Sequence, residues 1–555
     1  MHVEQKKSNS SFLIQGMILA GAGILTRLIG IAYRIPVNNI LGDEGQGFYG
    51  CAFSIYNIAL LLTSYSLPLA VSKLVSARVS KGEYKNAQRI LKGALMFALV
   101  VGAAVGLLVF FFSDFIAGSI MSLKLSVYAL RVLAPGLFIV AVMGVFRGYF
   151  QGMGTMIPTA VSQILEQIVN AIVSIIGASY LLEMGKKVAE GDVNSSLPYA
   201  YGAAGGTLGT VLGALTGLIF LLVLMKLYYP RMKKQLNRDL TSKTESYKTI
   251  YAVLFFTIAP VILSTAINNL NDALDQGIFS SIMLSQGYTE KETTSFLGMF
   301  TGKYNTLIYI PVTVANALGA SMIPSLVMTA SNAAAKEVKQ KISIGIRLVM
   351  LIAIPSAVAF MAMPHQILSL LYVGSIDTPA MMLRAGAITV IFNCFAAVTN
   401  AIFQGLNRMM IPVKHGAISL AVHIVSLLLL LAGFRLGVYA LIGGNLIFAV
   451  AMCILNGRGL QKEFGYRQEL KKTLFLPAIA SLIMGLSVLI LWNVSAIFIP
   501  DKLATVITIF VAILVYIVSL LRMGALDAEE MSALPKGAKL LRMCRKFHLM
   551  KEETK

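Results

Sequence analysis

The sequence predicts an all-α polytopic membrane protein, with about 14 transmembrane helices in two pseudo-symmetric parallel lobes around a central cavity. Three features support this prediction: an apolar composition, an uneven distribution of basic residues and an internal repeat. Of the 555 residues, 57% are hydrophobic and 13% are charged, and the mean hydropathy is +0.77. One soluble core could not bury so much apolar surface, so a membrane environment is indicated.

The candidate spans are apolar windows of about 20 residues. We interpret the first as an uncleaved span, because it is too long for the core of a signal peptide. The windows cover residues 12–33, 49–70, 91–112, 127–150, 157–182, 201–226, 250–276, 297–327, 343–363, 381–403, 412–433, 437–456, 474–494 and 501–522.

Membrane topology explains the net charge of +21 better than nucleic-acid binding does. With the N-terminus placed in the cytoplasm, 35 of the 46 Lys and Arg fall in segments on the cytoplasmic side. Loops that remain inside a cell carry this excess of positive charge. We therefore expect a multi-pass cell-membrane protein with both termini in the cytoplasm and no nucleic-acid partner.

An internal repeat relates the two halves of the chain. Residues 130–152 align without gaps on residues 383–405, at an offset of 253 residues, and both copies begin Leu-Arg and end Phe-Gln-Gly. Matching spans are separated by an even number of spans, so the halves are parallel. The predicted organisation is an N-terminal lobe at 1–226, a basic cytoplasmic linker at 227–249, a C-terminal lobe at 250–456, additional spans at 457–522 and a basic cytoplasmic tail at 523–555.

Two arginines lie within the first span. Arg27 and Arg34 are seven residues apart, which places them on nearly the same helical face. An arginine that faces lipid costs about 2.5–3.5 kcal/mol, so this pair indicates a wet cavity that receives an anion. For Arg34, which lies near the end of the span, snorkelling to the interface is the alternative.

Polar residues follow one face of the seventh and the fifth spans. Asn268, Asp272 and Asp275 recur at helical spacing, and we expect them to share the cavity of the arginines unless Asp275 lies in the outer interface. Glu166 lies about ten residues into the fifth span, where it could be protonated, bind a cation or pair with an arginine from a neighbouring span. A structural role between helices is the alternative.

A series of four glycines in the sixth span indicates packing. Gly205, Gly209, Gly213 and Gly217 recur every fourth residue, so they form a stripe that lets a neighbouring backbone approach closely.

Motifs for catalysis do not emerge from the sequence. The chain contains no G-x-x-x-x-G-K-[ST] motif, and its histidines lack the spacing of metal ligands such as H-E-x-x-H. We therefore expect a secondary transporter, with no cofactor and no metal site, rather than an enzyme.

The segment LTRLIGIAYRIPVNNILGDEGQGFYG at 25–50 and the FQG…IP pattern of both repeats resemble the polysaccharide-biosynthesis branch of the MOP exporter superfamily. The likeness is strongest to the stage V sporulation protein B group, which is related to peptidoglycan lipid II flippases. It implies a flippase that moves an undecaprenyl-diphosphate-linked cell-wall precursor, lipid II foremost, from the inner to the outer leaflet by alternating access.

The resemblance also implies roles for residues. Arg27 and Arg34 match in type two arginines of the first span in lipid II flippases, and Lys303 corresponds to an arginine of the eighth span, although it could also be an interfacial anchor. Asn268 and Asp272 are expected to join these residues in substrate binding. Glu166, Asp272 and Asp275 are candidates for coupling transport to H⁺ or Na⁺, and the membrane potential is a further driving force.

Other cargoes remain open. A second hypothesis is a flippase for another lipid-linked polysaccharide repeat unit, in growth or in sporulation. A multidrug cation antiporter of the same superfamily would need an acidic cavity, whereas here the cations in the spans outnumber the carboxylates. A membrane scaffold without transport is the last alternative. Expected partners are the lipid-linked diphosphate sugar, membrane lipids and proteins of cell-wall synthesis or division.

Overall fold

The computed structural model describes residues 2–64, 67–190, 192, 194–331 and 335–525, so most of the predicted tail lies outside the described residues. Every element assigned in these ranges is helical, as the sequence predicts. Short π-helical or 3₁₀ turns join some of the helices. The α-helices are α1 (His2–Thr63), α2 (Leu67–Val79), α3 (Tyr84–Phe111), α4 (Ser113–Phe115), α5 (Val127–Gly152), α6 (Ile157–Val188), α7 (Leu197–Leu236), α8 (Tyr247–Ser285), α9 (Glu290–Gly298), α10 (Asn305–Ser331), α11 (Ala335–Ala362), α12 (Pro364–Leu371), α13 (Asp377–Gly386), α14 (Thr389–Gly405), α15 (Met410–Leu428), α16 (Val438–Phe464), α17 (Leu476–Phe498) and α18 (Asp501–Arg522).

Among the described residues, eleven helices are long and apolar enough to cross a membrane. A twelfth span arises if α13 and α14, which are bent by 53° relative to each other, are counted together. The sequence predicts about 14 spans. The first two predicted spans lie in one run, Gly21–Val79, which the Gly42 break of α1 interrupts between them. The seventh predicted span lies in α8, Tyr247–Ser285, which begins with the apolar stretch Tyr247–Ala259.

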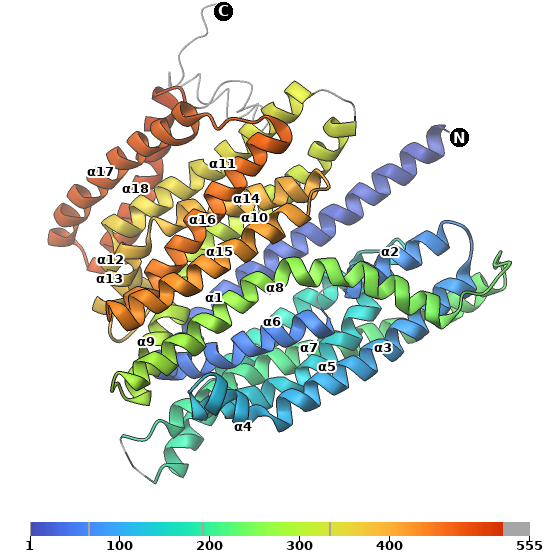
Figure 1. Ribbon diagram of the computed structural model, residues 1–555, viewed down its shortest axis with the longest axis horizontal. Coiled ribbons are helices and arrows are strands. Elements are labelled where there is room, and N and C mark those ends of the chain that lie inside the picture. Colours follow the sequence, from blue (N-terminus) through green and yellow to red (C-terminus); the bar gives the residue numbers. More distant parts are fainter. Residues whose placement is uncertain (1, 65–66, 191, 193, 332–334, 526–555) are drawn as a thin grey trace, which may run out of the picture. The chain divides into compact units, whose positions relative to one another are not determined.

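The chain divides into two compact units, Met1–Gly302 (unit 1) and Lys303–Lys555 (unit 2). Helices α8 and α9 belong to unit 1, so this division lies later in the chain than the lobe boundary predicted from the sequence. Within unit 1, α5 packs between α3 and α7, and these three helices run side by side (Figure 1).

Helix α1 is interrupted at Gly42, which has φ 64° and ψ −175°. A residue with a side chain rarely adopts a positive φ, whereas glycine does so without strain. Beyond this break, α1 packs closely on α9: a Cβ added at Gly47 would lie 2.1 Å from the Thr294 carbonyl oxygen. The capping box formed by Thr289 and Glu292 begins α9 and fixes where that helix starts.

The glycine stripe of α7 packs directly on α6, which confirms the packing role predicted from its spacing. A Cβ at Gly205 would lie 2.0 Å from the carbonyl oxygen of Gly177, and one at Gly213 would lie 2.6 Å from the carbonyl oxygen of Glu166. Only glycine permits such an approach, because any side chain would overlap the neighbouring backbone. The stripe therefore sets the position of α6, including that of Glu166.

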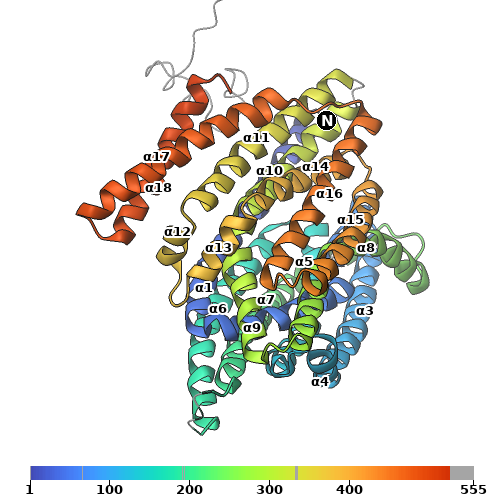
Figure 2. The same ribbon diagram turned by 60° about the vertical axis from the view of Figure 1, so that its left-hand side comes forward.

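In unit 2, α17 and α18 pack against each other and α17 also packs on α11 (Figure 2). Their contact is largely apolar and includes Met363, Met484 and Tyr516. The Tyr516 hydroxyl donates a hydrogen bond of 2.8 Å to the Leu351 carbonyl oxygen on α11. The last two helices are thus anchored to the rest of unit 2 by burial and by a specific polar contact.

The segment between α7 and α8, within the predicted linker, is held on the turn between α2 and α3. Asn86 Nδ2 donates to the Lys243 carbonyl oxygen at 3.1 Å, and the Glu245 N–H donates to Asn86 Oδ1 at 3.0 Å. Arg78 forms an ion pair with Glu245, and Lys85 Nζ lies 3.4 Å from Asp239 Oδ2. We call residues 237–246 and the contacts they make to residues 78–89 the linker clamp.

Asp239 is the most strongly bonded carboxylate of the linker clamp. Its carboxylate accepts hydrogen bonds from the Lys85 N–H at 2.9 Å and from the Thr241 hydroxyl at 2.7 Å. Burial alone would raise the pKa of Asp239, but these hydrogen bonds together lower the pKa below its ordinary value. The clamp is therefore formed with Asp239 ionised.

Candidate functional site

Arg27 and Arg34 are both exposed on the part of α1 that precedes the Gly42 break. The neighbouring face of α1 is covered by α6, where Tyr33 is buried and its hydroxyl accepts a hydrogen bond of 3.2 Å from Asn170 Nδ2. One face of this part of α1 is thus packed on α6, and both arginines are exposed beside it. This arrangement presents two guanidinium groups, about two turns apart, in the same direction.

Glu166 on α6 forms an ion pair with Arg147 on α5, with Arg147 Nη2 and Glu166 Oε2 2.7 Å apart. The Arg147 Nε–H donates to Ser162 Oγ at 2.9 Å, and the two charged side chains are only 12% and 20% exposed. Of the three states that the sequence leaves open for Glu166, the structure shows the pair with an arginine from a neighbouring span. Its role in ion coupling stays a prediction.

The polar stripe of α8 is divided between two faces. Asn271, Asp275 and Gln276 are buried, whereas Asp272 is exposed. The side chain of Asn268 lies outside the described part of the chain. The structure therefore separates Asp272 from Asp275, which the sequence analysis placed on one face, because residues three apart on a helix differ by about 60° in direction.

Lys303 is buried, with 2% of its surface exposed. Its Nζ donates a hydrogen bond of 2.9 Å to the Ser375 carbonyl oxygen, in the turn between α12 and α13. The ammonium group is thus engaged inside unit 2. Binding of substrate by Lys303 stays a prediction, and the observed bond is one that a structural anchor would make.

Unit 2 also contains a partly buried polar network that was not predicted from the sequence. Asn456 on α16 is fully buried and contacts His415 on α15 together with Thr399 and Asn400 on α14. The sequence signal was the presence of four polar side chains within otherwise apolar spans: Thr399, Asn400, His415 and Asn456. Within the described ranges, no three His, Cys, Asp or Glu side chains gather closely enough to hold a metal ion.

Comparison with known proteins agrees with this architecture. A family model described as "Polysaccharide biosynthesis protein" matches residues 13–330. The chain is 26% identical to the lipid II flippase MurJ of Bacillus subtilis (strain 168) over 439 residues, 76% of this chain and 77% of that protein. It is also 26% identical to stage V sporulation protein B of the same organism over 400 residues, 72% of this chain and 74% of that protein.

Among solved structures, a lipid II flippase MurJ in an inward closed conformation matches with a TM-score of 0.64 and 12% sequence identity. The match covers 91% of this chain and 98% of that protein. At this identity the likeness establishes the fold, an all-helical multi-pass membrane protein. Because the family model covers more than half of its length, the chain belongs to the polysaccharide biosynthesis protein family.

Proposed function

We propose that this protein is a flippase that moves an undecaprenyl-diphosphate-linked cell-wall precursor, lipid II foremost, from the inner to the outer leaflet by alternating access. Its similarity to MurJ over 439 residues supports the class of cargo. The observation that carries the proposal is the arginine stripe of α1, on which Arg27 and Arg34 are both exposed while the adjacent face is packed against α6.

The chemistry of a diphosphate suits this stripe. A guanidinium group presents a planar fork of N–H donors that binds two phosphate oxygens at once. The polyprenyl tail would remain in lipid while the charged head group occupies the wet region that the arginines require. Outward movement of an anion also runs with an inside-negative membrane potential, which contributes about 2.3 kcal/mol per charge per 100 mV.

The test is flipping of a fluorescent lipid II analogue by the purified protein in liposomes. Arg27→Ala should lower the rate about tenfold or more, because a hydrogen bond to a charged group contributes about 1.5–3 kcal/mol. Arg131→Ala is the matched control, since Arg131 forms an exposed ion pair with Asp114 and should not bind the cargo. Equal rates for Arg27→Ala and the wild type would refute the proposed site.

A second cargo is favoured by the similarity to stage V sporulation protein B, which is as high as the similarity to MurJ. In this alternative the protein flips another lipid-linked polysaccharide repeat unit. Lipid analysis of a depleted strain separates the two hypotheses, because the precursor that accumulates on the cytoplasmic side identifies the cargo. Accumulation of neither precursor would contradict both.

We also propose that both termini lie in the cytoplasm, and the distribution of Lys and Arg supports this orientation. Cys544, in the C-terminal tail, allows a direct test with a membrane-impermeant maleimide. Labelling should occur in inside-out vesicles and not in protoplasts, in which the reagent reaches only the outer face of the membrane. The reverse pattern would overturn this orientation.

A further inference from the structure

The polar face of α6 contains one amide that the fold does not use. Gln163, Glu166, Gln167 and Asn170 follow one another at helical spacing. Glu166 is held in its ion pair, Asn170 is buried and donates to the Tyr33 hydroxyl, and Oε1 of Gln163 is buried. The Gln167 side chain is partly exposed, and its amide makes no hydrogen bond within the described part of the chain. Gln167 is therefore available to another partner.

Gln167 and Glu166 face different neighbours, because successive residues of an α-helix differ by about 100° in direction. Glu166 turns toward Arg147 on α5. Gln167 turns toward α1, where its Oε1 atom lies 3.9 Å from the position of a Cβ added at Gly30. Because Gly30 has no side chain, the amide of Gln167 lies close to the backbone of α1.

Gly30 lies within the arginine stripe of α1. It follows Arg27 by three residues and precedes Arg34 by four, which are the spacings of neighbours on one helical face. Along the helix axis, Gly30 is about 4.5 Å from Arg27 and about 6 Å from Arg34. The Gln167 amide therefore approaches α1 between the two arginines, both of which are exposed.

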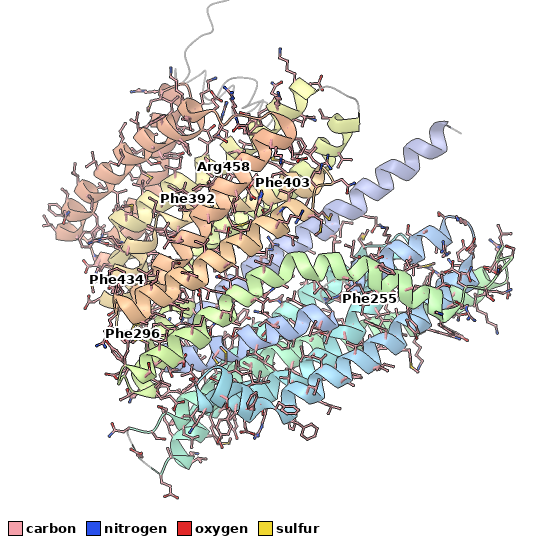
Figure 3. The ribbon with its side chains drawn as sticks, in the orientation of Figure 1. Phe255, Phe296, Phe392, Phe403, Phe434 and Arg458 are labelled. Atoms are coloured by element: carbon pink, nitrogen blue, oxygen red, sulfur yellow. The ribbon has the colours of Figure 1, made fainter. Side chains whose placement is uncertain are left out.

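The surroundings of Gln167 favour a polar ligand. The spanning helices of unit 1 expose many large apolar side chains, such as Phe255 on α8, which is 64% exposed (Figure 3). Arg27, Arg34 and Gln167 depart from this pattern at one place. Polar side chains that met only lipid would lack hydrogen-bond partners, so water or a polar ligand reaches the helices here.

We propose that Gln167 is a further binding residue of the arginine stripe, and that its Nε2 group donates a hydrogen bond to a phosphate oxygen of the cargo between Arg27 and Arg34. The identity of this ligand, a lipid-linked diphosphate, rests on the proposed function. An amide suits the position, because it adds a donor without adding a third positive charge. Its Oε1 atom can at the same time accept from a guanidinium N–H and hold that group in place.

The test is binding of two ligands to the protein in lipid nanodiscs: undecaprenyl diphosphate, which carries no sugar, and a fluorescent lipid II analogue. Gln167→Met keeps the length of the side chain but removes its donor and its acceptor. This variant should weaken binding of both ligands about tenfold, because a hydrogen bond to a charged group is lost. Gln167→Glu should weaken both further, since a carboxylate repels phosphate and pairs with the arginines itself.

Gln151→Met is the matched control, because the Gln151 Nε2 group already donates to Thr159 Oγ1 at 3.2 Å, at the contact between α5 and α6. It should bind both ligands as the wild type does. Thermal unfolding of each variant in detergent shows that the fold is kept.

Gly30→Leu tests the same contact from the side of α1. A leucine there would occupy the space beside the Gln167 amide, so it should weaken binding of both ligands. The double variant with Gln167→Met should bind no more weakly than Gly30→Leu alone. Losses that add would contradict the contact between the two positions.

Two results would overturn the proposal. In the first, Gln167→Met binds both ligands as tightly as the wild type does. In the second, it weakens binding of the lipid II analogue alone, which would mean that Gln167 contacts the sugar and not the diphosphate. If undecaprenyl diphosphate binds as expected but the wild type flips no lipid-linked precursor, the role of Gln167 stands and the proposed function fails. If Arg27→Ala slows flipping while Gln167→Met binds normally, the reverse holds.

Discussion

The two units hold neighbouring helices together through different polar groups. In unit 1, α5 and α6 are joined by the Arg147–Glu166 ion pair. In unit 2, α14, α15 and α16 are joined through the uncharged side chain of Asn456. The comparison teaches that contacts between helices can be held either by compensated charges or by a network of neutral groups.

The glycines of the two repeats differ in the same way. On α7 they face the backbone of α6, as at Gly205 and Gly177, so the two helices are drawn together. On α16, Gly444 and Gly459 face the rings of His423 and His415 instead. Glycine therefore serves close backbone approach in unit 1 and provides space for imidazole rings in unit 2.

The largest expected effect tests the ion pair. Arg147→Ala leaves the Glu166 carboxylate in a largely buried site without its partner, which should lower the free energy of unfolding by about 3–5 kcal/mol. Thermal and denaturant unfolding in detergent measure the change. The double variant Arg147→Met with Glu166→Leu is the control, because it removes both charges and should recover most of the loss. If the double variant recovered none of the loss, the ion pair would contribute more to stability than the compensation of two buried charges.

The next effect tests the glycine contrast. Gly205→Ala should destabilise by about 2–3 kcal/mol, because its Cβ would meet backbone that cannot move aside. Gly459→Ala should cost less, about 1–2 kcal/mol, since the obstacles are the His415 and Phe403 rings, which are side chains rather than backbone. Gly457, with no heavy atom within 4 Å of an added Cβ, is the matched control. Equal losses for the first two variants would contradict the contrast.

A smaller loss is expected for the neutral network. Asn456→Leu should lower the free energy of unfolding by about 1–2 kcal/mol, because Asn400 and His415 lose a buried partner while the volume of the side chain is kept. The measurement is the same unfolding experiment. If Asn456→Leu lowered the free energy of unfolding as much as Arg147→Ala does, the network would stabilise the fold as strongly as the ion pair.

The smallest effect concerns the linker clamp of unit 1 and depends on pH. The pKa of Asp239 in the linker clamp is lower than in the unfolded chain, so its stabilising contribution is present above the unfolded value of about 3.9 and is lost as the pH falls through the lower folded value. Asp239→Asn should therefore unfold more easily than the wild type at pH 6, and this difference should disappear in strong acid. A difference that persists there would refute the assignment to ionised Asp239.

The regular features of this molecule were predictable because they depend on period and composition. The apolar windows and the four-residue glycine series follow from helical geometry, and the helices and the α6–α7 packing confirm the all-helical class and the packing role of the glycines. The two related lobes that the 253-residue repeat predicts stay a prediction. The sequence also indicated that Glu166 could pair with an arginine. It did not identify Arg147, because the alignment of α5 against α6 depends on tertiary packing.

Other features could not be read from spacing. Asp272 and Asp275 fit one stripe by period, yet α8 buries one and exposes the other, because the width of a buried face depends on the helices around it. The Asn456 network joins residues that are 41 to 57 positions apart in sequence, so no local pattern indicates it. The first two predicted spans lie in one run, Gly21–Val79, and the Gly42 break of α1 lies between them.

The linker clamp determines where this chain can be cut for coexpression as two fragments. A cut within residues 237–246 would remove the backbone partners of Asn86 and detach α8 from its anchor. The turn at Gly287, between α8 and α9, is a better place, because an added Cβ there meets nothing within 4 Å and Tyr288 is exposed. A split protein made at Gly287 keeps every contact of the clamp within one polypeptide.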